Sequence, residues 1–233
     1  MGEKIIGILG GMGPEATADL FLRIIKATRV ERDQDHPRTI VYSNSKVPDR
    51  TAAVLGEGES PVPEMLRAAR GLERAGAEFL IIPCNTAHNF IDEVREQVGV
   101  PILNMIELAA ISAGSQHKGL SKAGLIATDG TLKSGIYERF FEQQGIRILA
   151  PSQGQQALVM EAIYRHIKTG DLEGGRGMLL EVSGHLIEVG AQLVVCGCTE
   201  VSLVLKDGDL SVPVLDPVQN LAETAVKFAL GEV

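Results

Sequence analysis

The stretch GAEFLIIPCNTAH at residues 76–88 recurs as GAQLVVCGCTEV at residues 190–201. In each copy an apolar run ends in a cysteine, Cys84 in the first and Cys198, 114 residues later, in the second. Short runs rich in Ile and Val are typical of the buried strands of a parallel sheet. We therefore predict two similar strand-to-helix units, each with a cysteine just past the end of its strand.

The similarity extends to both sides of this motif. GVPILNMIELA from Gly99 matches SVPVLDPVQNLA from Ser211, and IGILGGMG from Ile6 weakly matches AGLIATDG from Ala123. Chance similarity between Ile-rich and Val-rich strands is the alternative, above all for the weak match. Three matches in the same order with nearly equal offsets favour a duplicated chain. Because ligands of open α/β sheets bind at the carboxyl ends of strands, two such halves would bring both cysteines to one cleft.

The rest of the chain alternates short apolar runs with longer segments of helical spacing. Strands are expected at residues 4–10, 39–43, 79–83, 102–104, 122–128, 147–150, 192–196 and 212–215. Helices are expected at residues 14–30, 62–75, 87–97, 134–144, 153–169, 172–189 and 218–230. This alternation predicts a parallel, doubly wound α/β architecture, with the boundary between the halves at 107–122. Residues 51–60 are interpreted as a surface loop, with a lid over the site as the alternative.

The composition excludes several classes of partner. Lysine and arginine total 22 against 30 aspartates and glutamates, so the net charge of −8 leaves no surplus of cations for nucleic acid or an anionic membrane surface. No stretch approaches the roughly 20 apolar residues of a membrane span. Three cysteines without an export signal predict free thiols in the cytoplasm rather than a disulfide framework.

The two repeated cysteines define the candidate chemistry. A cysteine at a strand-to-helix junction meets the positive end of the following helix, which predicts a thiol pKa below the ordinary value of about 8.5. Hydroxyl and acid/base side chains follow each cysteine within one turn. Packing as a small hydrophobe is the alternative for any single thiol, and it explains Cys196. It does not explain a motif that recurs.

Zinc, redox and nucleophilic roles are further alternatives. Four side chains are potential zinc ligands: Cys84, His88, Cys196 and Cys198. Their spacing matches no common zinc pattern, so no metal is predicted. A redox pair is disfavoured because C-x-x-C is absent and a disulfide within C-x-C would be strained. Nucleophilic catalysis needs one thiol and a base such as His88 or His185. A pair of thiols suggests instead that one group removes a proton from a carbon and the other returns a proton to the opposite face. No phosphate cradle with a lysine accompanies the thiols, so no cofactor is predicted.

Six motifs spread over the chain occur in an order that is typical of one protein family. They are GILGGMGPEAT from Gly7, VPDR from Val47, IPCNTAH from Ile82, ATDGT from Ala127, IKTGD from Ile167 and GCTE from Gly197. They resemble the cofactor-independent aspartate/glutamate racemase family, most closely its aspartate racemase branch, essentially from end to end. The resemblance implies an α/β homodimer in which two pseudosymmetric three-layer domains with mostly parallel sheets, 1–111 with 212–233 and 112–211, enclose the active site.

The resemblance also implies roles for individual residues. Cys84 and Cys198 are the paired acid/base groups acting on a small acidic amino acid, aspartate, with glutamate as the alternative. The implied substrate-binding residues are Asn85, Thr86 and Thr128 at the α-carboxylate, Arg50 and Lys168 at the distal carboxylate, and in addition Thr199 and Met12. Glu200 stands where glutamate-specific relatives carry a histidine, which indicates the aspartate branch and a role in the proton handling of Cys198. Without the resemblance, Arg50 is interpreted as a surface arginine, Lys168 as a lysine at a helix C-terminus and Glu200 as an acid at a helix start.

Other functions remain open at this point. Residues 11–16 satisfy the dinucleotide-binding pattern G-x-G-x-x-A after a strand. However, Pro14 lacks one amide that a pyrophosphate would use, and Ser43 and Asn44 stand where an acid should meet the ribose. Relatives of the same fold isomerise maleate, racemise hydantoins or decarboxylate aryl malonates. A protein that binds a small molecule without turning it over is the remaining alternative.

Overall fold

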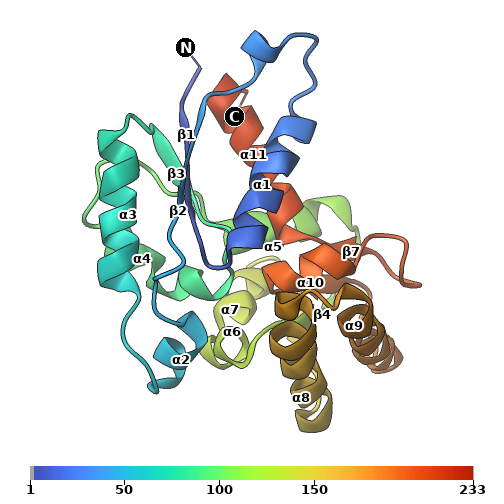
Figure 1. The fold of residues 1–233 in the computed structure, drawn as a ribbon. Coiled ribbons are helices and arrows are strands. Elements are labelled where there is room, and N and C mark those ends of the chain that lie inside the picture. Colours follow the sequence, from blue (N-terminus) through green and yellow to red (C-terminus); the bar gives the residue numbers. More distant parts are fainter. Residues whose placement is uncertain (1–2, 233) are drawn as a thin grey trace. The chain divides into compact units, whose positions relative to one another are not determined.

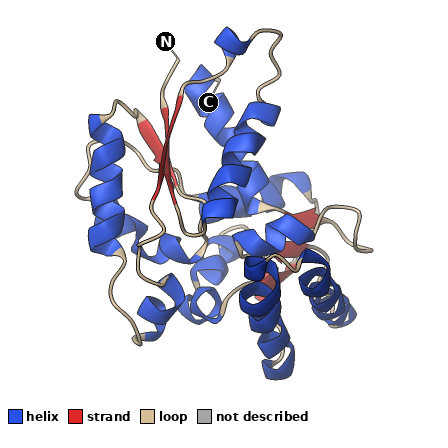
Figure 2. Cartoon of the chain, in the orientation of Figure 1, coloured by secondary structure: helices blue, strands red, loops and turns tan. Residues whose placement is uncertain are grey.

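The computed structural model describes residues 3–232, which divide into two compact units. The first unit contains residues 3–105 with 218–232, and the second contains residues 106–217. Figure 1 follows the chain through both units, and Figure 2 shows helices around the short strands of each. All the strand pairs are parallel, so the predicted α/β class with parallel sheets is confirmed.

The first unit is built on a three-stranded sheet in the order β2–β1–β3. Its strands are β1 (Ile6–Gly10), β2 (Thr39–Ser43) and β3 (Phe79–Ile81). One face is covered by α3 (Val62–Arg74), and the other by α1 (Pro14–Ala27) and α11 (Pro217–Leu230) (Figure 1). Its shorter helical segments are η1 (Asp33–Asp35), α2 (Arg50–Leu55), η2 (Thr86–Phe90) and α4 (Ile91–Arg95).

The junction between β1 and α1 shows how the local sequence positions these elements. Pro14 occupies the first turn of α1, where the N–H that proline lacks has no partner within the helix. The buried face of the helix repeats every three to four residues at Ala16, Thr17, Leu20 and Ile24. Gly10 leaves room for Thr17, whose Oγ1 accepts a hydrogen bond from Gly11 N at 2.8 Å. The loop after β1 is thereby tied to the first turn of α1.

The second unit is built on a four-stranded sheet in the order β5–β4–β6–β7. Its strands are β4 (Lys122–Ile126), β5 (Arg147–Leu149), β6 (Val194–Cys196) and β7 (Val214–Leu215). One face packs against α5 (Met105–Gln116) and α7 (Ile136–Glu142). The other packs against α8 (Gln153–Glu161), α9 (Leu172–Glu188) and α10 (Thr199–Val204). A short helix, α6 (Asp129–Ser134), follows β4.

The two sheets repeat one topology. The order β5–β4–β6 reproduces the order β2–β1–β3. Leu80 in β3 bridges to Ile102, just as Val194 in β6 pairs with Val214. The glycines that begin the two motif copies both have a φ of +101°, a left-handed value that favours glycine. The topology of each unit therefore agrees with a duplicated chain.

Several elements differ from the sequence prediction. Residues 102–104 contain only an isolated bridge at Ile102 instead of a strand, and residues 87–97 are divided between η2 and α4. The helix predicted at 134–144 is α7, and α6 before it was not predicted. The predicted helix 153–169 is α8 followed by a π turn, η3 (Ala162–His166), and a 3-10 turn, η4 (Ile167–Thr169). The units divide at 105/106 and 217/218 instead of 111/112 and 211/212, because α5 packs in the second core and β7 pairs with β6.

Candidate active site

The first-unit cysteine lies at the carboxyl end of β3. Cys84 N donates to Ile82 O at 2.9 Å, and the chain turns directly into η2. The Cys84 side chain is only 7% exposed, and the neighbouring Asn85 and Thr86 are also buried. A thiol, an amide and a hydroxyl group are thus gathered at one edge of the sheet.

His88 fixes the turn that carries Cys84. Its Nδ1 lies 2.8 Å from Cys84 O, so this nitrogen carries the proton and donates, while Nε2 accepts a hydrogen bond from Met105 N at 3.1 Å. Burial lowers the pKa of His88 from 6.5 to about 4, although the hydrogen bond to Cys84 O favours the charged form. The ring is neutral with both nitrogens occupied, and the alternative base, His185, lies exposed on α9. His88 is therefore structural, and neither histidine supports the nucleophilic alternative.

The burial of His88 predicts a pH-dependent stability. The unfolded chain binds this proton below pH 6.5 and the folded protein only near pH 4, so this group lowers the free energy of unfolding as the pH falls through that window. The loss is about 3 kcal/mol and disappears above pH 6.5. In urea unfolding at several pH values, His88→Gln should lack this slope, whereas the matched control His185→Gln should keep it. Equal slopes for wild type and His88→Gln would contradict the assignment.

Arg50 begins α2, which packs against η2. Asp49 caps this helix by accepting a hydrogen bond from Ala52 N at 2.8 Å. Nη1 of Arg50 donates to Val47 O at 3.1 Å and to Pro48 O at 3.0 Å, which orients the guanidinium group. The first unit therefore places the predicted arginine on the helix next to the cysteine turn.

Met12 belongs to the same buried apolar cluster as Cys84. It is 3% exposed and lies two residues after Gly10, the last residue of β1. The structure therefore places Met12 in the core around the thiol, where it contributes apolar packing.

Cys198 occupies the corresponding place in the second unit. β6 ends at Cys196, Gly197 follows, and Cys198 precedes the first residue of α10. A Cβ atom at position 197 would lie 2.5 Å from Leu125 Cδ1 and 2.8 Å from Ala127 Cβ. Glycine is therefore needed for the chain to pass so close to β4 before it turns into the helix.

Glu200 joins Cys198 to a lysine. The Cys198 thiol donates to Glu200 Oε2 at 2.9 Å, and Thr199 Oγ1 donates to the same oxygen at 3.1 Å. The other carboxylate oxygen, Oε1, lies 3.5 Å from Lys168 Nζ. Cys198 and Glu200 are 8% and 7% exposed. A buried thiol, a carboxylate and an ammonium group thus follow one another in contact.

The environment of Cys198 stabilises the protonated thiol. Burial raises the pKa of Cys198 well above its ordinary value, the negative charge of Glu200 raises it further, and Lys168 opposes these effects. The predicted lowering by the following helix is therefore wrong for this cysteine. α10 has only six residues, and its dipole is outweighed by desolvation and by a carboxylate in hydrogen-bond contact. Cys198 rests as a thiol.

Thr128 follows β4 and caps α6. Its Oγ1 accepts a hydrogen bond from Thr131 N at 3.4 Å and shares another with the Thr131 hydroxyl at 3.2 Å. Thr128 and Thr199 are 4% and 3% exposed. The second unit thus places two buried threonines just beyond the ends of the neighbouring strands β4 and β6, and Thr199 directly follows Cys198.

Two aromatic side chains of this region, Tyr137 and Tyr164, were not predicted from the sequence. Tyr137 is fully buried, and burial, together with the nearby ionisable groups of Cys196, Cys198 and Asp216, raises its pKa. The Tyr164 ring centroid lies 4.7 Å from the ammonium group of Lys168, four residues later. Only this last pair has a signal in the sequence, because helical neighbours are spaced by three or four residues.

Other sequence predictions concern Cys196, metals and membranes. Cys196 is fully buried in β6, as expected for a packing residue. Within residues 3–232, no group of three or more His, Cys, Asp or Glu side chains is placed to hold a metal ion. None of the described helices combines the length and the apolar character needed to cross a membrane.

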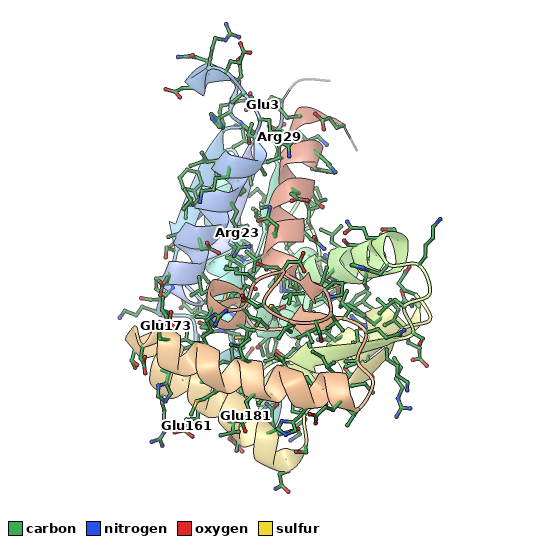
Figure 3. The ribbon with its side chains drawn as sticks, turned by 90° about the vertical axis from the view of Figure 1, so that its right-hand side faces the viewer. Glu3, Arg23, Arg29, Glu161, Glu173 and Glu181 are labelled. Carbon is green, nitrogen blue, oxygen red and sulfur yellow. The ribbon has the colours of Figure 1, made fainter. Side chains whose placement is uncertain are left out.

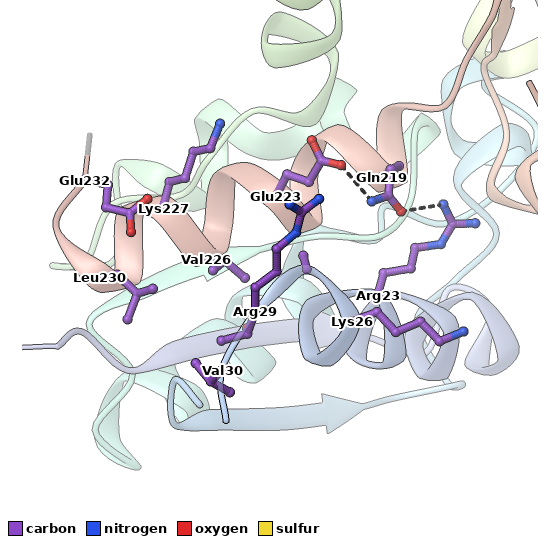
Figure 4. Close-up of a pocket in the computed structure, with 12 residues that line it drawn as sticks. Arg23, Lys26, Arg29, Val30, Gln219, Glu223, Val226, Lys227, Leu230 and Glu232 are labelled. Carbon is purple, nitrogen blue, oxygen red and sulfur yellow. Dashed lines mark hydrogen bonds between the residues drawn. The ribbon is translucent and has the colours of Figure 1, made fainter. Parts of the chain in front are cut away.

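A cavity of about 620 Å³ in the first unit lies apart from these residues. It opens between α1 and α11, where Figure 3 shows Arg23 and Arg29 beside α11. Figure 4 shows Gln219 donating to Glu223 and accepting from Arg23 at its rim. None of the predicted site residues lines this cavity, so it is separate from the candidate active site.

Known amino-acid racemases are similar to this chain along nearly its whole length. The broad specificity amino-acid racemase RacX of Bacillus subtilis (strain 168) is 26% identical over 231 residues, covering 97% of this chain and 99% of RacX. The structure of Picrophilus torridus aspartate racemase matches with a TM-score of 0.86 at 32% identity, covering 97% of this chain and 94% of that one. An aspartate racemase homologue from Pyrococcus horikoshii OT3 matches with a TM-score of 0.78 at 28% identity, covering 97% and 99%.

A family model confirms the resemblance seen in the motifs. The model described as Asp/Glu/hydantoin racemase matches residues 9–225, which include both cysteines and every other predicted site residue. The chain therefore belongs to the Asp/Glu/hydantoin racemase family and is a racemase.

Proposed function

We propose that this chain interconverts L- and D-aspartate without a cofactor, by proton transfer between Cys84 and Cys198 on opposite faces of the α-carbon. The main support for this proposal is that the same arrangement of a strand followed by a cysteine occurs once in each unit. Each unit places one buried cysteine directly beyond the equivalent strand, β3 or β6, of the same topology. The 32% identity to an aspartate racemase over 97% of the chain supports aspartate as the substrate.

One turnover moves one proton off the substrate and one proton onto it. A thiolate takes the α-hydrogen as a proton, so that the Cα–H bond breaks and its electron pair stays on the α-carbon. The opposite thiol then donates its proton and forms a Cα–H bond of inverted configuration. Because Cys198 rests as a thiol, it serves as the donor in one direction and must lose its proton before it serves in the other.

The substrate carboxylates require polar groups around the two thiols. In our proposal Asn85, Thr86 and Thr128 hold the α-carboxylate, with Thr199 near Cys198. Arg50 reads the distal carboxylate, for which its planar fork is suited. The bonds from Arg50 to two backbone carbonyls support this role because they hold the guanidinium in one orientation.

A racemase of broad specificity is the second candidate. It is favoured by the match to RacX along 97% of this chain. Glutamate is the nearest competitor of aspartate, because one methylene group in a substrate changes binding by only about 1–3 kcal/mol. The proposal also includes a cytoplasmic homodimer. The exposed apolar side chains of Phe21, Leu22 and Ile25 on α1 provide a surface for it.

A racemisation assay in deuterated water across a panel of amino acids tests the proposed substrate. Deuterium should enter the α-carbon of aspartate as its configuration inverts, and alanine should react at least about 100-fold more slowly, because it lacks the distal carboxylate. Similar rates across acidic and neutral amino acids would favour the broad-specificity candidate. Absence of both inversion and exchange with every amino acid would contradict amino-acid racemisation.

A further inference from the structure

Lys168 reaches the thiol of the second unit through one carboxylate. Its Nζ lies 3.5 Å from Glu200 Oε1, while Glu200 Oε2 accepts the hydrogen bond of the Cys198 thiol at 2.9 Å. The side chains of Lys168 and Glu200 are 32% and 9% exposed. Glu200 therefore connects a partly exposed cation to a buried thiol and uses a different oxygen for each.

The chain around Lys168 is shaped to hold it at Glu200. The helix widens from α8 into the π turn η3 and tightens into η4, and π turns are frequent at functional sites. Ile167 is fully buried, and Gly175 on α9 leaves space for it, since a Cβ there would collide with Ile167 Cγ1. The Tyr164 ring, 4.7 Å from Nζ, adds a cation–π contact. Buried neighbours thus set the direction of this lysine.

A buried pair of a thiol and a carboxylate holds a negative charge more easily when a cation lies nearby. Burial disfavours the ionised form of either group, whereas an opposite charge within about 4–6 Å favours it. The Cys198–Glu200 pair carries one negative charge in total when Glu200 is ionised and the thiol is protonated. If that charge is lost to an added proton, Cys198 has no acceptor for its own proton and can act only as a donor.

We propose that Lys168 is a positioning residue for proton transfer, which keeps the Cys198–Glu200 pair anionic so that Cys198 can become a base. In the direction in which Cys198 accepts the α-proton, its S–H bond breaks and a Glu200 Oε2–H bond forms. The negative charge moves to sulfur, which then takes the proton from the α-carbon. In the other direction both Cys198 and Glu200 start protonated: the Cys198 S–H bond breaks as its proton passes to the α-carbon, and the thiolate then takes the proton of Glu200 Oε2, which returns the pair to its single negative charge. This role rests on the proposed two-cysteine function and differs from binding of the distal carboxylate, the role that the family resemblance implies for Lys168.

A double-mutant cycle tests the proposal. The variants are Lys168→Met, Glu200→Gln and their combination, with Lys168→Arg as the charge-preserving change. Lys133→Met removes a cation from an exposed position on α6 of the same unit and is the matched control. The measurements are kcat and KM for aspartate as a function of pH. Lys168→Gln repeats them if the methionine variant does not fold. The other titratable groups near the pair, Tyr137, Cys196 and Asp216, are the same in every variant.

The expected result is a loss in kcat rather than a rise in KM. Lys168→Met should lower kcat about 100-fold with little change in KM and move the acidic limb of the kcat/KM profile up by about one pH unit or more. Lys168→Arg should restore both, and Lys168→Met should add little to Glu200→Gln, because both changes break the same contact.

A different pattern would overturn this inference. If Lys168→Met raises KM, leaves the acidic limb in place and adds fully to Glu200→Gln, Lys168 acts on the substrate directly. That outcome leaves the two-cysteine function intact. The proposed function fails by a separate observation, full racemisation by Cys198→Ala.

Discussion

Cys198→Ala is expected to lower aspartate racemisation by about 10³-fold or more in both directions. Removal of one acid/base group typically costs 10²–10⁴-fold, and the hydroxyl group that also donates to Glu200, that of Thr199, is a much weaker acid than the thiol. Both directions must fall together, because the equilibrium constant between enantiomers is one. Exchange of the α-hydrogen with solvent should nevertheless survive for the single enantiomer whose proton Cys84 removes.

Cys84→Ala should give the mirror image of this result. Racemisation is lost, and solvent exchange survives only for the opposite enantiomer. Cys196→Ala is the matched control, because Cys196 is a fully buried cysteine of β6 whose loss should reduce stability and spare catalysis. The measurements are chiral chromatography for racemisation and proton NMR in deuterated water for exchange. Exchange of the same enantiomer by both catalytic-cysteine variants would contradict the assignment of one face to each thiol.

Arg50→Ala is expected to reduce kcat/KM for aspartate by about 10²- to 10³-fold. A guanidinium bound to a carboxylate through two hydrogen bonds is worth more than an ordinary hydrogen bond, and its removal leaves the substrate charge unpaired. Arg50→Lys should recover only part of the loss, because a lysine cannot reproduce the fork. The measurement is kcat/KM for aspartate against kcat/KM for alanine.

The alanine comparison separates binding from local structure. Arg50 also donates to Val47 O and Pro48 O, so its removal disturbs the start of α2 whatever the substrate. A structural effect alone would reduce activity toward both amino acids equally, and that outcome would exclude Arg50 as the reader of the distal carboxylate. Arg67→Ala, which breaks an exposed ion pair with Glu64 on α3, is the control and should leave both values unchanged.

The strand ends were predictable from the sequence because their signals are local. The repeated motif locates Cys84 and Cys198 beyond β3 and β6, since apolar runs of branched residues mark buried strands. By contrast, α5 was missed because its glycine and serine residues read as a boundary between the halves. Its buried Ile106, Ala109 and Ala113 recur at helical spacing, so a signal was present there.

The chemistry around Cys198 depends on contacts that the sequence does not show. The contact between Lys168 and Glu200 joins η4 to α10. It depends on the π turn before η4 and on the packing of Ile167 against Gly175 of α9. The direction of the Cys198 pKa shift follows from burial and from the orientation of one carboxylate. Neither is encoded in spacing along the chain, so the motif pointed to Cys198 and the structure corrected the direction of its pKa shift.

The most direct test of two-base racemisation follows the label in both enantiomers. L-aspartate is incubated with the wild-type protein in deuterated water, the reaction is stopped at low conversion, and the two enantiomers are separated for mass spectrometry. We predict that the D-aspartate formed carries deuterium at the α-carbon while the recovered L-aspartate does not, because the thiol that removes the proton is not the one that returns it. Deuterium in the recovered L-aspartate at the rate of product formation, or D-aspartate that keeps the original hydrogen, would contradict the two-cysteine account.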